Sequence, residues 1–252
     1  MIVINKQIGE SMGALIKRAR LERGLGEDVK LTFAGRLDPL AEGVVILLEE
    51  AEIPRKSEFI GLPKTYQFEL LLGINTDSHD PLGIVTGVIP VSNEKHEEVK
   101  ETLKKVTQDL IGTHTFSYPQ FSSKTVDGTP LWVTGREARE GQNTLLKAPE
   151  RSMRVDTLKL ESDTTHSTQE LLSAVMKFVG AVEGDFMQKQ VIESWKTALV
   201  GHDNAIWYSY TLLMECGSGT YVRTICEEIG KKLKCGGIAF RIKRVAVGNH
   251  QV

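Results

Sequence analysis

The amino-acid sequence predicts an α+β protein, with helices packed on an antiparallel or mixed sheet. Three observations favour this class. Apolar residues recur at helical spacing in some segments and at strand spacing in others. The two kinds of segment do not alternate regularly, as they do in a parallel α/β fold. With 252 residues, 40% of them hydrophobic, the chain is also long enough to bury a substantial core.

The first third of the chain supplies both kinds of segment. Residues 1–4 form a short apolar run typical of a strand. Ser11 is a good N-cap for a helix over 12–23, and Gly24 and Gly26 are expected to end it. Residues 43–48 are apolar throughout, as in a buried strand, and 66–72 alternate as a half-buried strand does. The residues expected to face inward are Met12, Leu15, Ile16 and Ala19 of the helix and Tyr66, Phe68, Leu70 and Leu72 of the second strand.

The rest of the chain continues this mixture. Periodicity predicts helices over 94–110, 169–179 and 221–233, the last one stopped by Gly236 and Gly237. Strand patterns cover 208–216 and about 240–247. Residues 111–150 show little periodicity, so we expect a long loop there, which in a compact domain is usually functional or mobile. Without a repeat or a convincing linker, we expect a single domain over residues 1–252.

Composition limits the classes of function. No stretch has the ~18 consecutive apolar residues of a membrane span, and the N-terminus lacks the pattern of a secretory signal. The three cysteines, Cys216, Cys226 and Cys235, are too widely spaced for a zinc knuckle and odd in number, so a reducing cytosol is expected. The net charge of −2 argues mildly against a nucleic-acid partner, although the position of positive charges matters more than their sum.

One carboxylate is singled out by its setting in AGRLDPLAEGVVILL (34–48). Asp38 precedes Pro39, which keeps the backbone of Asp38 extended or turned, and Gly35 and Gly43 allow tight turns around it. A carboxylate on a stiff loop at the edge of a sheet is placed as a nucleophile or general base would be. Taken alone, however, an Asp-Pro pair is more often an Asx turn that holds a loop together.

Two other segments contain candidate partners for Asp38. Arg223 falls in the first turn of the last predicted helix, where it could pair with a carboxylate from another loop. Lys64 and Tyr66 lie two residues apart on a strand and therefore share a face, where a tyrosine could stack on a base. By spacing alone, Arg223 could equally be a surface arginine, and Tyr66 is more often a core aromatic.

In order and spacing, these pieces resemble the TruB-type tRNA pseudouridine-55 synthases over nearly the whole chain. AGRLDPLAEGVV is similar to the nucleophile motif of that family, KTY to its Lys-x-Tyr motif, and SGTYVRTI to the motif that carries its arginine. Further blocks similar to the family are NKQIGESM, LGINTDSHDPLG, YPQFSSKTVDGTPLW with GREAREG, GDFMQ and RIKRVAVG.

The resemblance implies a pseudouridine synthase fold, a bent and mostly antiparallel mixed sheet flanked by helices, with no metal and no organic cofactor. It also implies that Asp38 is the catalytic carboxylate, that Arg223 pairs with it, and that Tyr66 stacks near the target base. Residues about 117–147 would form an RNA-gripping loop that closes on the RNA. The residues expected to bind RNA are Phe33, Arg36, Lys64, Lys124, Ile242 and Arg244. Of these, Lys64, Lys124 and Arg244 would meet phosphates, and Ile242 would line the site.

The function implied is the isomerisation of uridine 55 in the T-loop of tRNA, by a cytoplasmic protein expected to be a monomer. The target nucleotide would have to be flipped out of its stack into a pocket. Two alternatives stay open: the same chemistry on another structured RNA, and a non-catalytic chaperone that keeps the fold and refolds tRNA.

The sequence departs from the family pattern in several places. Phe33 stands where a histidine is usual, Gln7 where a proline is usual, and Phe121 where a tyrosine is usual. The chain also ends at Val252, directly after the last expected core strand, without the small C-terminal RNA-binding domain that most members have. These departures bear on which RNA is recognised rather than on the fold.

Overall fold

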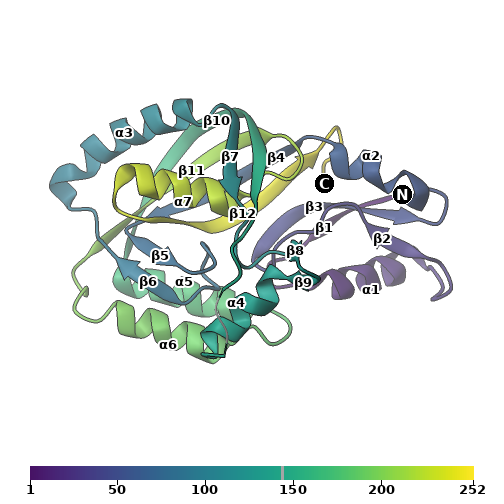
Figure 1. Ribbon diagram of the computed structural model, residues 1–252, viewed down its shortest axis with the longest axis horizontal. Helices are drawn as coiled ribbons and strands as arrows, with labels where there is room; N and C mark the ends of the chain where they lie inside the picture. Colours follow the sequence, from purple (N-terminus) through teal and green to yellow (C-terminus); the bar gives the residue numbers. More distant parts are fainter. Residues whose placement is uncertain (143–144) are drawn as a thin grey trace.

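The fold is organised around one large sheet, seen in Figure 1. The computed structural model describes residues 1–142 and 145–252. Its eight-stranded sheet has the order β1-β3-β12-β4-β11-β10-β7, and β2 pairs with β3 outside this path. Neighbouring strands are antiparallel except for β3 and β12, which run parallel. The mixed, mostly antiparallel sheet predicted from the sequence is therefore confirmed. The strands are β1 (Ile2–Lys6), β2 (Leu31–Phe33), β3 (Ala41–Glu49), β4 (Lys64–Leu72), β7 (Gly112–Ser117), β10 (Glu150–Ser167), β11 (Ile206–Cys216) and β12 (Gly237–Val247).

Helices cover both faces of this sheet (Figure 1). Helices α1 (Met12–Arg23), α3 (His96–Asp109) and α7 (Val222–Leu233) contribute to one apolar cluster, and α5 (Thr168–Gly180) and α6 (Gln188–Ala198) to another. The alternation of β4 divides its side chains between the two: Phe68 and Leu70 belong to the first cluster and Leu71 to the second. The run 43–48 is apolar throughout because both faces of β3 are covered. Val45 belongs to the first cluster, and Val44 belongs to a third cluster on the other face.

Smaller elements surround the sheet. Strands β5 (Ile74–Thr76) and β6 (Val85–Val88) form one hairpin, and β8 (Thr125–Val126) and β9 (Thr129–Pro130) form another. The remaining helical elements are α2 (Lys56–Gly61), α4 (Leu131–Arg139) and two 3₁₀ turns, Ile53–Arg55 and Asn93–Lys95. Figure 1 shows both chain ends on the side of the molecule formed by β1, β2 and β3.

Two helix ends test the expected capping residues. α1 ends as predicted: the Ser11 hydroxyl accepts the N–H of Ala14 at 3.0 Å, and Gly24 takes a left-handed conformation with φ of 61°. α7 ends differently, because Lys234 rather than a glycine takes the left-handed position, with φ of 58°. Gly237, expected to lie beyond the helix as a stop, already belongs to β12.

The long loop predicted over 111–150 was wrong for most of its length. It contains β7, the β8–β9 hairpin and α4. The buried positions of α4 are Leu131, Thr134 and Gly135, and only the first has a large apolar side chain, so few apolar residues mark this short helix in the sequence. β10 was also missed, because most of its side chains are exposed and their alternation is confined to its first half.

Among the described residues, no helix combines the length and the apolar character needed to cross a bilayer.

The sheet takes strands from both ends of the sequence, since β1 and β12 both pair with β3. The expectation of one domain over residues 1–252 stays a prediction.

Candidate active site

Asp38 lies in the loop between β2 and β3, which is held by contacts with its backbone. The ammonium group of Lys6 donates to the carbonyls of Pro39 at 3.0 Å and Ala41 at 2.7 Å. The N–H of Gly9 also donates to the Pro39 carbonyl, at 2.9 Å. Lys6 is only 1% exposed, and its burial lowers its pKa to about 8. The loop is therefore a fixed platform, from which the side chain of Asp38 remains 32% exposed.

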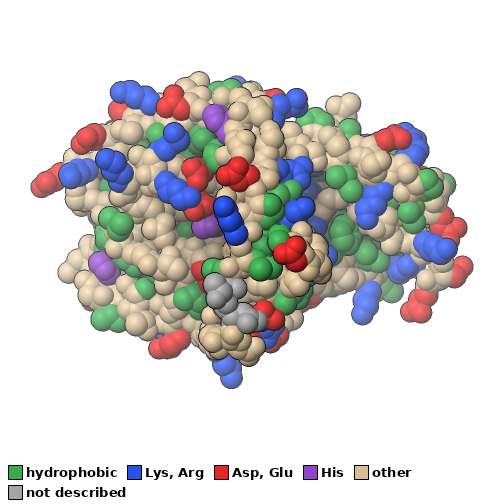
Figure 2. Space-filling model, viewed as in Figure 1, with side chains coloured by type: hydrophobic (Ala, Val, Ile, Leu, Met, Phe, Trp, Pro, Cys, Tyr) green, Lys and Arg blue, Asp and Glu red, His purple; other side chains and the backbone are tan. Residues whose placement is uncertain are grey.

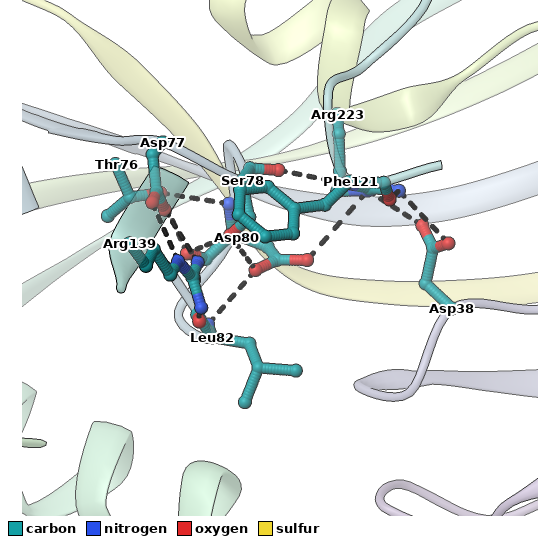
Figure 3. A network of polar contacts seen from close by, with 9 residues as sticks. All are labelled: Asp38, Thr76, Asp77, Ser78, Asp80, Leu82, Phe121, Arg139 and Arg223. Carbon is teal, nitrogen blue, oxygen red and sulfur yellow. Dashed lines mark hydrogen bonds and ion pairs between the residues drawn. The ribbon is translucent and has the colours of Figure 1, made fainter. Parts of the chain in front are cut away.

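Arg223 pairs with Asp38 through two charge-assisted hydrogen bonds (Figure 3). Its Nε donates to Asp38 Oδ2 at 2.7 Å, and its Nη2 donates to Oδ1 at 3.1 Å. The Arg223 side chain is 2% exposed and comes from the first turn of α7. Burial opposes its charge, but Asp38 and Asp80 outweigh this effect and raise its pKa. The geometry thus contains the pairing that the resemblance implied, and it fixes the orientation of the carboxylate.

A second carboxylate, Asp80, stands behind Arg223. Its Oδ2 lies 3.8 Å from Arg223 Nε, and its Oδ1 accepts hydrogen bonds from the Ser78 hydroxyl at 2.6 Å and the Leu82 amide at 3.0 Å. Burial raises the pKa of Asp80, while Arg223 and Ser78 act in the opposite direction. Arg223 Nη1 also donates to the Ser78 carbonyl at 2.9 Å. The β5–β6 loop and the Asp38 loop therefore meet on one guanidinium.

The segment expected to grip RNA is attached to the same group of contacts (Figure 3). The Phe121 carbonyl accepts from Arg223 Nη2 at 3.1 Å. Arg139 of α4 donates two hydrogen bonds to Asp77, at 2.8 and 2.7 Å, and its Cζ lies 4.1 Å from the centre of the Phe121 ring. Sequence reasoning gave no role to Asp77, Asp80 or Arg139. The only signal was their position in two blocks similar to the family, LGINTDSHDPLG and GREAREG.

Tyr66 and Ile242 lie on neighbouring strands beside the Asp38 loop. Both are almost buried, at 9% and 7% exposed, and they belong to the same apolar cluster as Leu37. Ile242 stands in register with Ala41, where β3 begins. Burial raises the pKa of the Tyr66 hydroxyl, Arg244 acts in the opposite direction, and Asp38 adds a smaller rise. A phenol and an aliphatic side chain therefore lie beside the loop that carries the carboxylate.

Lys64 and Arg244 are placed differently from what the sequence suggested. Lys64 is 6% exposed, and its ammonium group donates to the carbonyl of Leu62 at 2.6 Å. Arg244 is 1% exposed and donates to the carbonyls of Val44 at 2.7 Å and Gly35 at 3.1 Å. Both cations serve backbone oxygens inside the protein, so their burial does not support contacts with phosphates. The phosphate contacts expected of Lys64 and Arg244 stay predictions, and the burial of both side chains speaks against them.

The other residues expected to bind RNA are more accessible. Phe33 ends β2, and its ring centre lies 5.6 Å from Cζ of Arg36 and 5.3 Å from Nζ of Lys56. Lys124 is exposed, and its Nζ lies 5.6 Å from the ring centre of Tyr118. Figure 2 shows Lys and Arg side chains in the hollow between the α4 side of the molecule and the β1–β3 side. The RNA contacts of Phe33, Arg36 and Lys124 stay predictions.

This arrangement offers a partly exposed carboxylate in a fixed orientation, next to a buried phenol. Such a carboxylate can attack an electrophilic carbon or accept a proton. Among residues 1–142 and 145–252, no group of three or more His, Cys, Asp or Glu side chains is arranged to hold a metal ion.

Comparison with known proteins adds a family to this geometry. The family model described as "TruB family pseudouridylate synthase (N terminal domain)" matches residues 23–183. Among curated proteins, "tRNA pseudouridine synthase B" of Opitutus terrae is 28% identical over 90% of this chain and 73% of its own length. The proteins of the same name from Dechloromonas aromatica and Aquifex aeolicus are 26% and 27% identical over 99% and 86% of this chain. The chain spans only 65% and 58% of the length of these two relatives.

Solved structures agree with the fold. The crystal structure of a Cbf5-Nop10-Gar1 complex contains a chain that matches 99% of this one with a TM-score of 0.54 and 14% identity. An H/ACA RNP bound to a substrate RNA containing 2'-deoxyuridine gives a TM-score of 0.52, also at 14% identity. This chain covers 49% and 48% of those chains. The pseudouridine synthase fold implied by the sequence is confirmed by these matches.

Proposed function

The chain belongs to the TruB family of pseudouridylate synthases, and on this premise we propose that it converts uridine to pseudouridine in RNA. The observation that carries the proposal is the Asp38–Arg223 pair, in which a carboxylate 32% exposed is held by a guanidinium 2% exposed. A buried ion pair left open to solvent on the carboxylate side suits a group that meets a substrate.

The substrate we propose is tRNA, and the nucleotide is uridine 55 in the T-loop. This choice is supported by the name shared by the curated relatives, tRNA pseudouridine synthase B. A nucleotide in a loop, such as uridine 55, is easier to flip out than one inside a stem, where flipping costs a few kcal/mol.

We also propose that the protein acts as a monomer in the cytoplasm.

The reaction needs no redox partner. The N1–C1′ bond of uridine breaks, the uracil turns, and a C5–C1′ bond forms. C5 then loses its hydrogen as a proton, and N1 takes one up, so that the product is an isomer of the substrate. Asp38 would either attack the base or the ribose covalently, or assist cleavage of the glycosidic bond. Arg223 would hold Asp38 in position, and Tyr66 would stack near the flipped uracil.

The test follows from the proton that leaves C5. A tRNA transcript carrying tritium at C5 of uridine is incubated with the wild type, with Asp38→Asn and with Asp38→Ala. We expect tritium release by the wild type and a loss of at least ~10²-fold in both variants. Asp109→Asn, an exposed position at the end of α3, serves as the control and should keep full activity. Full activity of Asp38→Ala would exclude the residue assignment.

The two open alternatives give different results. One outcome is that the wild type releases no tritium, while the wild type and the Asp38→Asn variant bind tRNA equally well. A non-catalytic chaperone is then the better description. If the wild type modifies RNA at another position, carbodiimide treatment followed by primer extension on total RNA will locate that position. A single stop at uridine 55 of tRNA, absent in Asp38→Ala, is the result we expect.

A further inference from the structure

The cations around Asp38 differ in whether a carboxylate neutralises them. Arg139 is paired with Asp77, and Arg223 with Asp38. Arg151, at the start of β10, is half-buried and forms no ion pair with any described residue. It is therefore a positive charge close to the site that lacks an acidic partner in the described part of the chain.

Neutral groups hold the guanidinium of Arg151 in place. Its Nη1 donates to the Tyr118 hydroxyl at 2.8 Å, and its Nη2 donates to the Ser218 carbonyl at 3.2 Å. A Cβ on Gly219 would lie 2.0 Å from Nη2, so the glycine leaves the space that the guanidinium occupies. These contacts fix the position of the group without compensating its charge, and they leave further N–H donors for an anion.

Arg151 lies at the base of the gripping segment and beside the site. The two ends of the segment meet where the Tyr118 amide donates to the Pro149 carbonyl at 3.0 Å. The ring of Tyr118 stands edge-on to that of Tyr221, with centres 5.7 Å apart. Tyr221 directly precedes α7 and lies two positions ahead of Arg223, which pairs with Asp38. Burial raises the pKa of Tyr221, and the charge of Asp38 adds to the rise. Arg151 is thus connected, through Tyr118 and Tyr221, to the start of the helix that carries Arg223.

A second cation stands near the same ring. The Nζ of Lys124 is 5.6 Å from the centre of Tyr118, and the Cζ of Arg151 is 5.7 Å from it. The Lys124 backbone is fixed, because its carbonyl accepts the amide of Leu131 at the start of α4. Lys124, like Arg151, forms no ion pair within the described residues.

The local field agrees with this geometry. The pKa of Lys64 is lowered to about 8, mainly by burial, and the charges of Arg244 and Arg151 contribute to this shift. Three cations therefore repel one another in this part of the molecule. An anion bound at Arg151 would reduce that repulsion. Because Arg151 is half-buried, dissolved salt would screen its attraction for the anion only partly.

We propose that Arg151, together with Lys124, binds a phosphate of the RNA backbone next to the target uridine. The inference rests on the proposed function, because it takes the anion to belong to RNA. A guanidinium offers paired N–H donors that match two phosphate oxygens, and Lys124 adds a mobile point charge. This pair takes the place of the phosphate contacts that the sequence suggested for Lys64 and Arg244.

The test measures how binding of a tRNA transcript depends on salt. Loss of one phosphate contact reduces the magnitude of the slope of log K against log salt by about 0.7–0.9. Arg151→Gln should therefore bind RNA more weakly than the wild type at about 50 mM salt. This difference in affinity should shrink about threefold at about 200 mM salt. Arg151→Lys keeps the charge and should keep the wild-type slope. Lys124→Gln changes an exposed side chain, is expected to fold, and should lower the slope by a similar amount.

Arg154→Gln is the matched control. It removes a positive charge from the same strand, but that side chain is 59% exposed and paired with Asp156 at 3.0 Å, so the wild-type slope is expected. Far-UV circular dichroism checks that each variant is folded. A folded Arg151→Gln variant with the wild-type slope overturns the inference, whatever Lys124→Gln does.

Failure of the inference and failure of the proposed function are distinct results. If the wild type releases tritium while Arg151→Gln keeps the wild-type slope, only the phosphate site is wrong. If the slope falls in Arg151→Gln but the wild type releases no tritium, the phosphate site holds and the catalytic proposal fails.

Discussion

Replacing Arg223 by methionine removes a cation that two carboxylates share. The guanidinium donates to both oxygens of Asp38 and to the carbonyls of Ser78 and Phe121, and it lies 3.8 Å from Asp80. Asp80 is 5% exposed, so without Arg223 it is left as a buried carboxyl without its cation. Breaking a buried pair from one side costs about 3–5 kcal/mol, and we expect the free energy of unfolding to fall by that amount.

The pH dependence of this loss tests its cause. Burial already raises the pKa of Asp80, and loss of Arg223 should raise it further. A carboxyl whose folded pKa is raised destabilises the protein above that pKa, and the cost disappears as the carboxyl is protonated. The deficit of Arg223→Met should therefore be larger at about pH 8 than at about pH 5. Adding Asp80→Asn should recover roughly 1–2 kcal/mol and remove most of the pH dependence.

Urea unfolding followed by circular dichroism provides the measurement, with an unchanged m-value as the sign that the unfolded state is comparable. Asp38→Asn is the control, because its side chain is 32% exposed and asparagine still offers an oxygen to Arg223, so it should cost about 1 kcal/mol or less. A loss of less than about 1 kcal/mol in Arg223→Met, or further destabilisation of the methionine variant by Asp80→Asn, would contradict the shared role of this cation.

Three further predictions concern other parts of the molecule. The pKa of Lys6 is about 8 in the folded protein, against an ordinary value of 10.5. As the pH rises, the folded state therefore loses this proton before the unfolded state does. The free energy of unfolding should rise between those two pH values by roughly 3 kcal/mol. Urea unfolding at several pH values should show a smaller rise in Lys6→Met. Gly9→Ala would place a Cβ 2.1 Å from the carbonyl oxygen of Ala181 and should cost over about 2 kcal/mol in urea unfolding. Gly24→Ala meets nothing within 4 Å and should cost about 1 kcal/mol, so equal losses would contradict this packing. Trp132 is 45% exposed, while the other two tryptophans are at most 1% exposed, so Trp132→Phe should remove most of the fluorescence that acrylamide quenches.

The parts of the fold that sequence predicted are those whose burial is one-sided. α3 and α5 bury one apolar stripe each, and β4 alternates between two covered faces. α4 and β10 are marked more weakly. α4 is short and buries one large apolar side chain, Leu131, and β10 alternates only over its first half and has most side chains in solvent. Periodicity reports the contrast between apolar and polar faces, so an element in which few apolar residues carry that contrast is easily overlooked.

The pairing at the site could not come from spacing. Asp38 and Arg223 are 185 residues apart, and only the resemblance to a family connected them. Lys64 and Arg244 show the opposite limit, because their burial does not support the phosphate contacts that their charge suggested. Their charge is plain in the sequence, whereas the carbonyls that they serve depend on the fold. Arg244 reaches the Val44 carbonyl because β12 pairs with β3, and Lys64 bends back to the Leu62 carbonyl just before its own strand.

Two departures from the family pattern have local physical explanations. Gln7 stands where proline is usual, and its N–H, which a proline would lack, donates to Glu10 at 2.9 Å. Arg18 in turn holds that carboxylate with bonds of 2.8 and 3.0 Å. Phe121 stands where tyrosine is usual, and a Cβ on Gly135 would lie 3.0 Å from its Cζ, the atom that carries the hydroxyl in tyrosine. The ring of Phe121 therefore packs where a side chain at position 135 would have to give way.

The net charge of −2 is a weak guide to the partner of this protein, because charges act through their neighbours. Away from the site many cations are matched, as Arg18 is with Glu10 and Lys100 with Asp163. At the site the accessible cations are distributed differently: within the described residues, none forms an ion pair with a carboxylate. These cations are Arg36 and Lys56 beside Phe33, and Lys124 and Arg151 beside Tyr118. Two aromatic rings, each flanked by positive charges without an acidic partner, therefore lie beside the Asp38 loop and its partners. These charges create a positive local potential that attracts a polyanion such as RNA, although the net charge of the chain is −2.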